Sequence, residues 1–208
     1  VGTLPGVEYA ATAMMAPWRD SRLLSFNLQF AVEGRRSENS KNDLRARFRF
    51  VSPGYFATLG IPLLEGRDFT DADRKEAEPV VIVSNSLAQQ LFPGQDAINR
   101  HIAWTDPLIK YANISPDRRR IVGVLADVDD ANIVTQRNLT IYQPFAQGPL
   151  FGATLLVRAR KDPYALVLTV SKTIRAAAAT QPVEHPGTLE DVRTEVLANN
   201  RVNTAVFG

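Results

Sequence analysis

Alternating apolar and polar residues in the first quarter of the chain predict β structure. Residues 7–12 form a plausible short strand, and residues 26–32 place large apolar side chains at every second position. This period of two is typical of a half-buried strand. Residues 45–50 repeat the pattern, with Arg45, Arg47 and Arg49 between the apolar positions. We expect this cationic face to be solvated on an antiparallel sheet; a phosphate-binding stripe is the alternative.

A short helix is predicted directly after this second strand. Ser52 suits the N-cap position and Pro53 the first helical position. Gly60 suits the position just past the helix end, where φ is positive. The apolar side chains of residues 55–59 then form one edge of a helix of about two turns.

The rest of the chain alternates between strands and helices, which predicts an α+β fold. Residues 79–84 contain four consecutive branched apolar residues, 80–83, and predict a strand buried on both faces. Further strands are expected at 101–104, 120–126, 139–143 and 154–160. Helices are expected at 85–92, at 163–179 after Asp162-Pro163, and after Thr188. Residues 181–187 would form a loop or a short strand. The unit of strand, helix and strand near residues 48–64 resembles the one that begins at residue 154, which indicates two related βαβ halves with a different segment between them.

Two long polar loops are candidate interaction surfaces, residues 34–43 and residues 105–119. The second loop contains Arg118, Arg119 and Arg120, which we interpret as solvated. A nucleic-acid patch is a weak alternative, because no aromatic residues accompany the arginines. The net charge of +2 over 208 residues adds little support to it.

The chain lacks the residues from which common catalytic sites are built. It has no cysteine, which excludes disulfides, thiolate nucleophiles and zinc–thiolate or iron–sulfur sites. Its two histidines, His101 and His185, lie far apart in the sequence. No Gly-x-Ser-x-Gly, Walker A or Gly-x-Gly-x-x-Gly motif is present. We therefore assign no catalytic, cofactor-binding or metal-binding residue, and expect that the protein is not an enzyme.

Acidic residues cluster in two turns, and they define the remaining chemical alternatives. These are Asp71 and Asp73 in one turn and Asp127, Asp129 and Asp130 in the other. Carboxylates of this kind could bind a hard cation such as Ca²⁺, but neither turn completes an EF-hand loop. A hydrolase would need two of them, such as Asp71 and Asp127, to converge in a cleft about 5–10 Å apart. We prefer the interpretation that they close turns and cap helices.

No uninterrupted apolar run approaches the ~20 residues that a transmembrane helix needs. The chain also lacks the pattern of a signal peptide. We expect it to be a fragment excised from a longer protein.

An ordered set of motifs resembles one family. The most specific is residues 51–69, VSPGYFATLGIPLLEGRDF. The others follow in order: Asp73, 79–85 (PVVIVSN), 87–94 (LAQQLFPG), 121–127 (IVGVLAD), 141–144 (IYQP), 156–158 (LVR), Asp162-Pro163 and Arg201. Together they resemble the periplasmic core domain of MacB-like, FtsX-type bacterial ABC transporter permeases. Asn99 departs from the family pattern, which usually has glycine before a basic residue, and the stretch 185–187 is atypical.

The resemblance implies a two-lobed fold. A porter-like βαβ lobe would comprise residues 1–75 and 148–208, and a smaller α/β lobe, called Sabre-like, would be inserted at 76–147. The domain would lie on the periplasmic side of the cell inner membrane, between two membrane helices. Val1 and Asn203 would then lie on one side of the domain, within roughly twice the 8–10 Å that separates packed helices.

The resemblance also implies a mechanical function. The domain would transmit ATP-driven motion of the membrane helices to substrate export or extraction, without catalytic residues or cofactors. Expected partners are a second permease half or subunit, a cytoplasmic ATP-binding subunit and a periplasmic adaptor; nucleic acid is not expected, and the isolated domain should be monomeric. The alternative is a free-standing periplasmic ligand-binding or adaptor module, which would need an enclosed, mostly apolar pocket.

Overall fold

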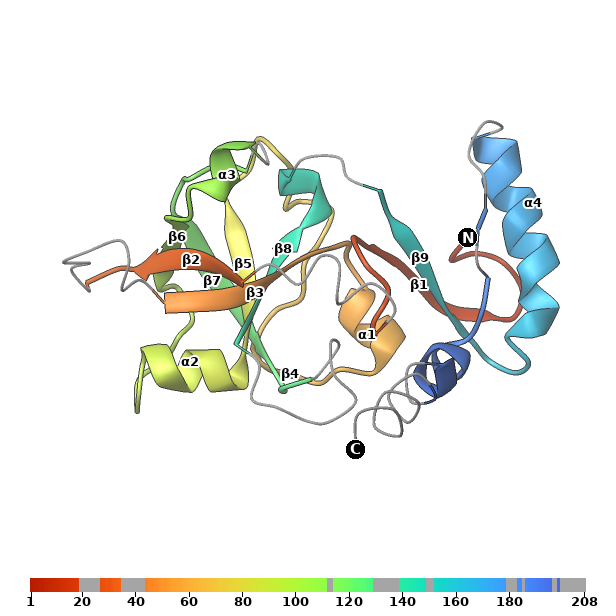
Figure 1. Cartoon of the computed structure of the whole chain (residues 1–208), viewed down its shortest axis with the longest axis horizontal. Helices are drawn as coiled ribbons and strands as arrows, with labels where there is room; N and C mark the ends of the chain where they lie inside the picture. The colour runs from red at the N-terminus through yellow and green to blue at the C-terminus, as the bar shows by residue number, and fades with distance from the viewer. Residues whose placement is uncertain are drawn as a thin grey trace.

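The structure is a computed structural model, and it describes residues 1–18, 27–34, 44–111, 114–128, 139–148, 152–178, 183–184, 186–195 and 198. Six strands close into a barrel (Figure 1). In order around it, they are β2 (Asn27–Val32), β6 (His101–Trp104), β7 (Arg119–Leu125), β5 (Val80–Ser84), β8 (Thr140–Pro144) and β3 (Leu44–Val51). Pairing between β3 and β2 completes the ring. A seventh strand, β4 (Leu63–Gly66), pairs with the far end of β7.

Aromatic and branched apolar side chains fill the barrel. The ring of Phe48 lies edge-on to Trp104, with centroids 5.3 Å apart, and to Phe50, with centroids 4.5 Å apart. The indole nitrogen of Trp104 donates to Oε1 of the buried Gln143 at 3.2 Å, so the one polar atom of this side chain has a partner. The helix α2 (Asn85–Leu91) adds Leu87 and Leu91 to the same core.

A two-stranded ribbon extends the sheet beyond the barrel. β1 (Val7–Ala13) runs antiparallel to β9 (Thr154–Ala159) over its whole length. Ala13 at the end of β1 also pairs with Val51 at the end of β3. β3 is therefore shared: it closes the barrel and also carries the ribbon. The helix α1 (Tyr55–Leu59) packs beside the ribbon, and Tyr55 and Phe56 form a second core with Tyr142 of β8.

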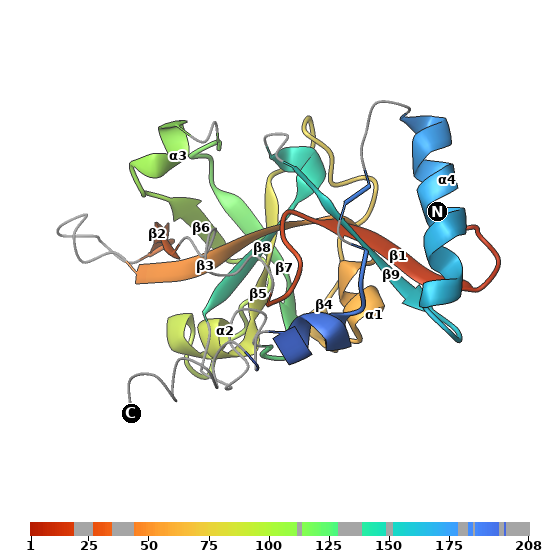
Figure 2. The ribbon, with the colours of Figure 1, turned by 45° about the vertical axis from the view of Figure 1, so that its right-hand side comes forward.

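The helix α4 (Val167–Ala177) lies on the side of the ribbon opposite the barrel, as Figures 1 and 2 show. It follows the one-turn helix η3 (Tyr164–Leu166), and a further helix spans residues 189–195. Asp162 accepts from the backbone N–H of Tyr164 at 2.9 Å, but Pro163 and not Asp162 occupies the N-cap position of η3. None of the α4 residues is buried, and Ala177 at its end is exposed. The smaller elements α3 (Leu108–Tyr111) and η2 (Phe145–Gln147) lie over one end of the barrel.

The α+β class and the predicted strands are confirmed, but the start predicted for α1 is wrong. Gly54, with φ of 78°, occupies the N-cap position, and Ser52 lies outside the helix. The Ser52 hydroxyl instead accepts from the backbone N–H of Thr12 at 2.9 Å, which ties β3 to β1. The predicted end is confirmed, because Gly60 has φ of 70°. There Arg158 of β9 donates to the carbonyl of Ala57 at 3.1 Å.

The solvated arginine face predicted for β3 is also wrong in part. Arg45 is exposed, Arg47 is half-buried and Arg49 is buried. The reason is that β3 enters the molecule: at its start one neighbour is β2, whereas its end lies between β8 and β1. Arg49 Nη1 donates to the carbonyl of Phe48 at 3.0 Å. An alternating pattern shows which residues share a face, but not how deeply that face is covered.

The division into lobes at residues 75/76 and 147/148 stays a prediction. β1 and β9 join the two sequence segments assigned to the porter-like lobe. β2 and β3, however, come from the first segment and share the barrel core with strands of the predicted insert. The predicted proximity of Val1 and Asn203 cannot be compared, because Asn203 lies outside the described residues. Of the predicted loop or short strand at 181–187, residues 183–184 and 186–187 are described, and they form no strand.

Candidate functional site

One of the two candidate interaction loops is described almost completely. Residues 105–119, which we call the α3 loop, contain the short helix α3 and cover one end of the barrel. The helix is a correction to the prediction of an irregular loop. The other candidate, residues 34–43, lies outside the described residues except for Gly34.

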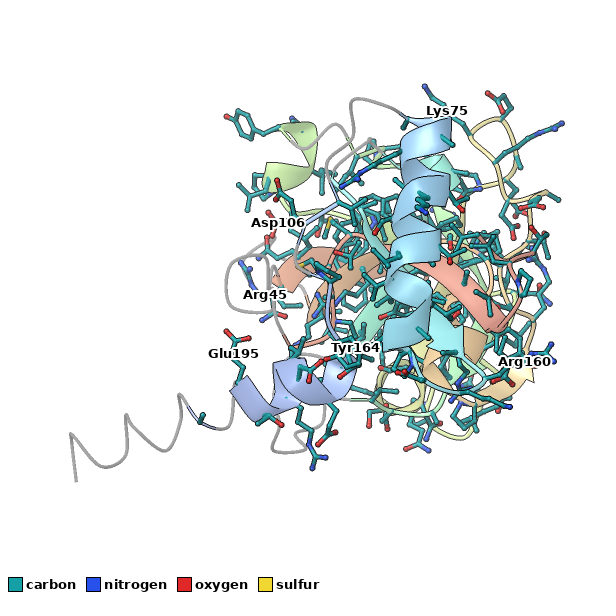
Figure 3. The ribbon with its side chains drawn as sticks, turned by 90° about the vertical axis from the view of Figure 1, so that its right-hand side faces the viewer. Arg45, Lys75, Asp106, Arg160, Tyr164 and Glu195 are labelled. Atoms are coloured by element: carbon teal, nitrogen blue, oxygen red, sulfur yellow. The ribbon has the colours of Figure 1, made fainter. Side chains whose placement is uncertain are left out.

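Asp106 anchors the α3 loop to the barrel. Its carboxylate is 4 % exposed; Oδ2 accepts from the backbone N–H of Gln29 at 3.1 Å, and Oδ1 accepts from that of Leu108 at 3.0 Å. Arg45 approaches the same carboxylate to 3.7 Å, and Figure 3 shows the two side chains next to each other. One side chain therefore joins β2 to the start of α3.

The anchored helix divides its side chains between core and solvent. Ile109 and, after the helix, Ile114 are buried in the barrel core. Leu108 and Tyr111 point outward, and Tyr111 is 89 % exposed. The α3 loop thus presents an apolar and an aromatic side chain to solvent at the end of the molecule.

The three consecutive arginines that end the loop have three different environments, which corrects the expectation that all are solvated. Arg118 is exposed and reaches Glu33 at 3.6 Å. Arg120 makes a two-pronged contact with Glu78 at 2.8–3.0 Å and donates to Asn99 Oδ1 at 2.9 Å. Arg119 points into the barrel and is 1 % exposed. Burial lowers the pKa of Arg119 to about 10, so it remains a cation at neutral pH.

The departure at Asn99 has a local explanation. Asn99 adopts φ of 67°, the left-handed conformation that glycine usually supplies and that asparagine tolerates best among the other residues. Its side chain then accepts from Arg120. The turn is therefore formed with asparagine in place of glycine.

The carboxylates singled out in the sequence have local partners. Asp73 is buried and accepts from both terminal nitrogens of Arg67 at 2.8 Å and from the backbone N–H of Thr70 at 2.8 Å. Asp127 accepts from the backbone N–H and the hydroxyl of Ser86, in the first turn of α2. Asp71 is exposed, and Asp129 and Asp130 lie outside the described residues. In the structure Asp73 closes a turn and Asp127 caps a helix.

Stability should fall in acid because of Asp73. Burial raises the pKa of its carboxyl, but the hydrogen bonds from Arg67 and Thr70 outweigh burial, and the pKa is lowered from 3.8. Because the pKa is lower in the folded than in the unfolded protein, the unfolded chain binds the proton first as pH falls. The contribution of the Asp73 carboxylate to the free energy of unfolding is therefore complete above pH 3.8, and it is lost as pH falls through the folded-state pKa. We expect Asp73→Asn to cost about 1–2 kcal/mol at pH 7. Urea unfolding of both proteins should show this difference shrinking below about pH 4.

Asp68 is a second titrating group near this site. Its pKa is raised, mainly by burial, so its protonation in acid acts in the opposite direction. The charge of Asp73 contributes to that rise, so the Asp68 effect cancels only in part between the two proteins. A difference that stayed constant down to the acid transition would contradict the role given to Asp73.

No metal centre is visible in the part of the chain that the structure describes, where no three histidine or acidic side chains form a group that could hold an ion. His101 contacts Glu33 at 2.9 Å, and His185 lies outside that part. No described helix is long and apolar enough to cross a membrane.

The sequence analysis did not predict the roles of two residues of the α3 loop, the anchoring by Asp106 and the burial of Arg119. Asp106 precedes Pro107, the same cap-and-proline pair that marks the helix after Asp162-Pro163. That signal could have located α3. Arg119 carries no such signal, because only the position of β7 in a closed barrel directs its side chain inward.

Comparison with known proteins gives the family. The profile of the MacB-like periplasmic core domain matches residues 4–185. This chain belongs to that family, whose members are extracytoplasmic domains of ABC transporter permeases. A search of curated proteins finds no match to it.

Solved structures share the fold at low sequence identity. The periplasmic region of MacB from Actinobacillus actinomycetemcomitans has a TM-score of 0.52 at 14 % identity, over 85 % of this chain and 88 % of that one. A domain of a putative permease from Porphyromonas gingivalis has a TM-score of 0.51 at 17 % identity, over 87 % and 68 %. The extracellular domain of the transporter YknZ from Gram-positive bacteria has a TM-score of 0.50 at 14 % identity, over 86 % and 81 %.

Proposed function

We propose that this chain is the periplasmic, non-catalytic domain of an ABC transporter permease anchored in the cell inner membrane. It would transmit ATP-driven motion of the membrane helices to substrate export or extraction. One structural observation carries the proposal: a continuous sheet joins the N-terminal strand to the barrel at the far end of the molecule.

The sheet is suited to transmitting displacement. β1 begins seven residues into the chain and is paired along its length with β9. β1 also pairs with the end of β3, and β3 pairs with β8 and β2 in the barrel. In the described part of the chain, the ribbon meets the barrel at one strand pair, Ala13 with Val51, and the core around Tyr55 and Phe56 packs against the same junction. Force applied at the ribbon would reach the barrel through these contacts.

A hydrogen-bonded contact links the last described helix to the same unit. Asp191 accepts from the hydroxyl of Tyr164 at the start of η3. The same carboxylate accepts from the backbone N–H of Thr188 at 2.6 Å, and the Thr188 hydroxyl accepts from the Asp191 N–H at 3.1 Å, as in a capping box. Movement of the segment after residue 188 would therefore act on η3 and α4.

The proposal includes partners. A second permease half or subunit and a cytoplasmic ATP-binding subunit would complete the transporter, with a periplasmic adaptor as a further partner. The isolated domain would be monomeric, because the membrane part would supply much of the dimer contact. The exposed Leu108 and Tyr111 of the α3 loop are available for contacts at the barrel end.

If the domain transmits motion as a rigid body, distances within it should not depend on nucleotide. Gln90 on α2 and Lys172 on α4 are exposed, and the domain has no cysteine of its own. We expect spin labels at Gln90→Cys and Lys172→Cys, in a full-length permease free of other cysteines, to report the same distance with and without ATP. A single label at Gln90→Cys should report a change between the two domains of the transporter, measured by pulsed electron resonance.

The two measurements separate the outcomes. A nucleotide-dependent distance within one domain would refute rigid transmission. A constant distance between domains would refute the involvement of this domain in the cycle. Coding sequence on both sides of the chain provides an independent test: apolar runs of ~20 residues support the permease, and polar flanks favour the free-standing module.

A further inference from the structure

Arg119 is a buried cation whose hydrogen-bonding capacity is mostly unused. Nη2 donates to the backbone carbonyl of Ser115 at 3.3 Å. Nε and Nη1 are buried and have no acceptor within hydrogen-bond distance. Among the described residues, these are the only buried side-chain nitrogen or oxygen atoms in that condition.

The surroundings of Arg119 make this arrangement unfavourable. Ile102 lies directly opposite it on β6, and Ile121 follows two positions later on the same strand. Ile102, Ile121 and Ile114 belong to the barrel core. The carboxylate that acts on Arg119 electrostatically is that of Asp117, which is exposed and accepts from the Ser115 hydroxyl. An unpaired cation among apolar side chains is strongly disfavoured unless a counter-charge joins it.

The nitrogens of Arg119 that have no acceptor indicate which kind of anion would fit as the counter-charge. A guanidinium carries five N–H donors in a plane, and Nη2 has two of them. With one hydrogen of Nη2 directed to Ser115, a complete two-nitrogen edge remains, formed by Nη2 with either Nε or Nη1. Two parallel N–H donors match the two oxygens of a carboxylate. A halide ion offers only one acceptor centre for the two donors, so it cannot align with each of them separately.

We propose that Arg119 binds the carboxylate of a small organic acid in the end of the barrel beneath the α3 loop. Residues 116–118, which lead into β7, are exposed, and Arg119 follows them directly. The loop is held at its other end by Asp106. Binding would require residues 115–118 to move away from the end of the barrel, because Nη2 of Arg119 is held by the Ser115 carbonyl. This site is independent of the transmission role and needs no partner protein.

Acetate is a suitable probe for the site. We expect the urea midpoint of this chain to rise and then saturate as sodium acetate replaces sodium chloride at constant ionic strength. The Nε–H NMR signal of Arg119 should shift along the same binding curve. Arg119→Lys keeps the charge but loses the two-pronged geometry, and it should bind acetate about tenfold more weakly.

Arg119→Met removes the charge at similar length. It should abolish the response to acetate and, without acetate, leave the domain as stable as the parent or more so. Arg160→Met is the matched control, because Arg160 is exposed on the loop after β9 and should leave the acetate response unchanged.

Several results would overturn the proposal. One is an equal acetate response in the parent and Arg119→Met. Another is a lower urea midpoint of Arg119→Met without acetate, which would make Arg119 a structural residue. A response to an acidic peptide but not to acetate would replace the small acid by a protein partner. If Arg119→Met does not fold, an unchanged Arg119 signal in the acetate titration of the parent refutes the site.

Discussion

Gly66→Ala should destabilise the domain by about 2–5 kcal/mol, a large part of the 5–15 kcal/mol that holds a typical domain folded. Gly66 has φ of 75°, where a side chain costs about 1–2 kcal/mol. An added Cβ would also lie 2.2 Å from the carbonyl oxygen of Val122 and 3.0 Å from the Cα of Gly123. Gly66 and Gly123 are partners in the β4–β7 ladder, so the clash is with backbone, and overpacking adds about 1–3 kcal/mol.

Gly94→Ala separates the two contributions to this cost. Gly94 has φ of 71°, close to that of Gly66, but an added Cβ would meet nothing within 4 Å. This variant should lose only the conformational part, about 1–2 kcal/mol. Urea unfolding of both variants measures the difference, provided that the slope m is unchanged. Equal losses in the two variants would show that β4 and β7 are not as close as described.

Phe48→Ala should destabilise the domain by a similar amount, about 3–5 kcal/mol. Its ring is buried and makes edge-to-face contacts with Phe50 and Trp104, so truncation leaves a cavity between two aromatic rings. The barrel is closed by backbone pairing, and its strands cannot collapse inward far enough to fill that space. Urea unfolding followed by far-ultraviolet circular dichroism is the direct measurement.

Two companion variants test this explanation. Phe48→Leu keeps most of the volume and should cost about 1–1.5 kcal/mol. Tyr111→Ala removes an aromatic side chain that is almost fully exposed, and its effect should stay within about 0.5 kcal/mol. A loss for Phe48→Ala no greater than that for Tyr111→Ala would be incompatible with a packed barrel.

Local patterns predicted the elements because local chemistry determines them. The apolar run at residues 79–84 is β5, which is buried at every position, and the glycine at position 60 ends α1 with positive φ. Ser52 shows the limit of this approach. Its hydroxyl can cap a helix or accept from another strand, and the choice depends on Thr12, forty positions away. Tertiary contacts decide between such alternatives.

The sequence did not predict the closed barrel or the interior of the α3 loop. Barrel closure depends on β2 pairing with both β3 and β6, and period-two alternation contains no information about partners. The environments of Arg49 and Arg119 follow from that closure. Both arginines look like ordinary surface residues when the chain is considered one strand at a time. Asp106, by contrast, was missed although its cap-and-proline signal was present.

The pairing of β1 with β9 has a consequence for biogenesis. Ala13 is matched with Thr154, so the strand made first must wait for almost the last strand to be synthesised and delivered. Until then β1 is an open edge, available to any other extended chain. Folding dominated by such distant pairings is slow, which prolongs the exposure. Covering the edge of β1 until β9 is synthesised would therefore protect the nascent chain from pairing with other chains.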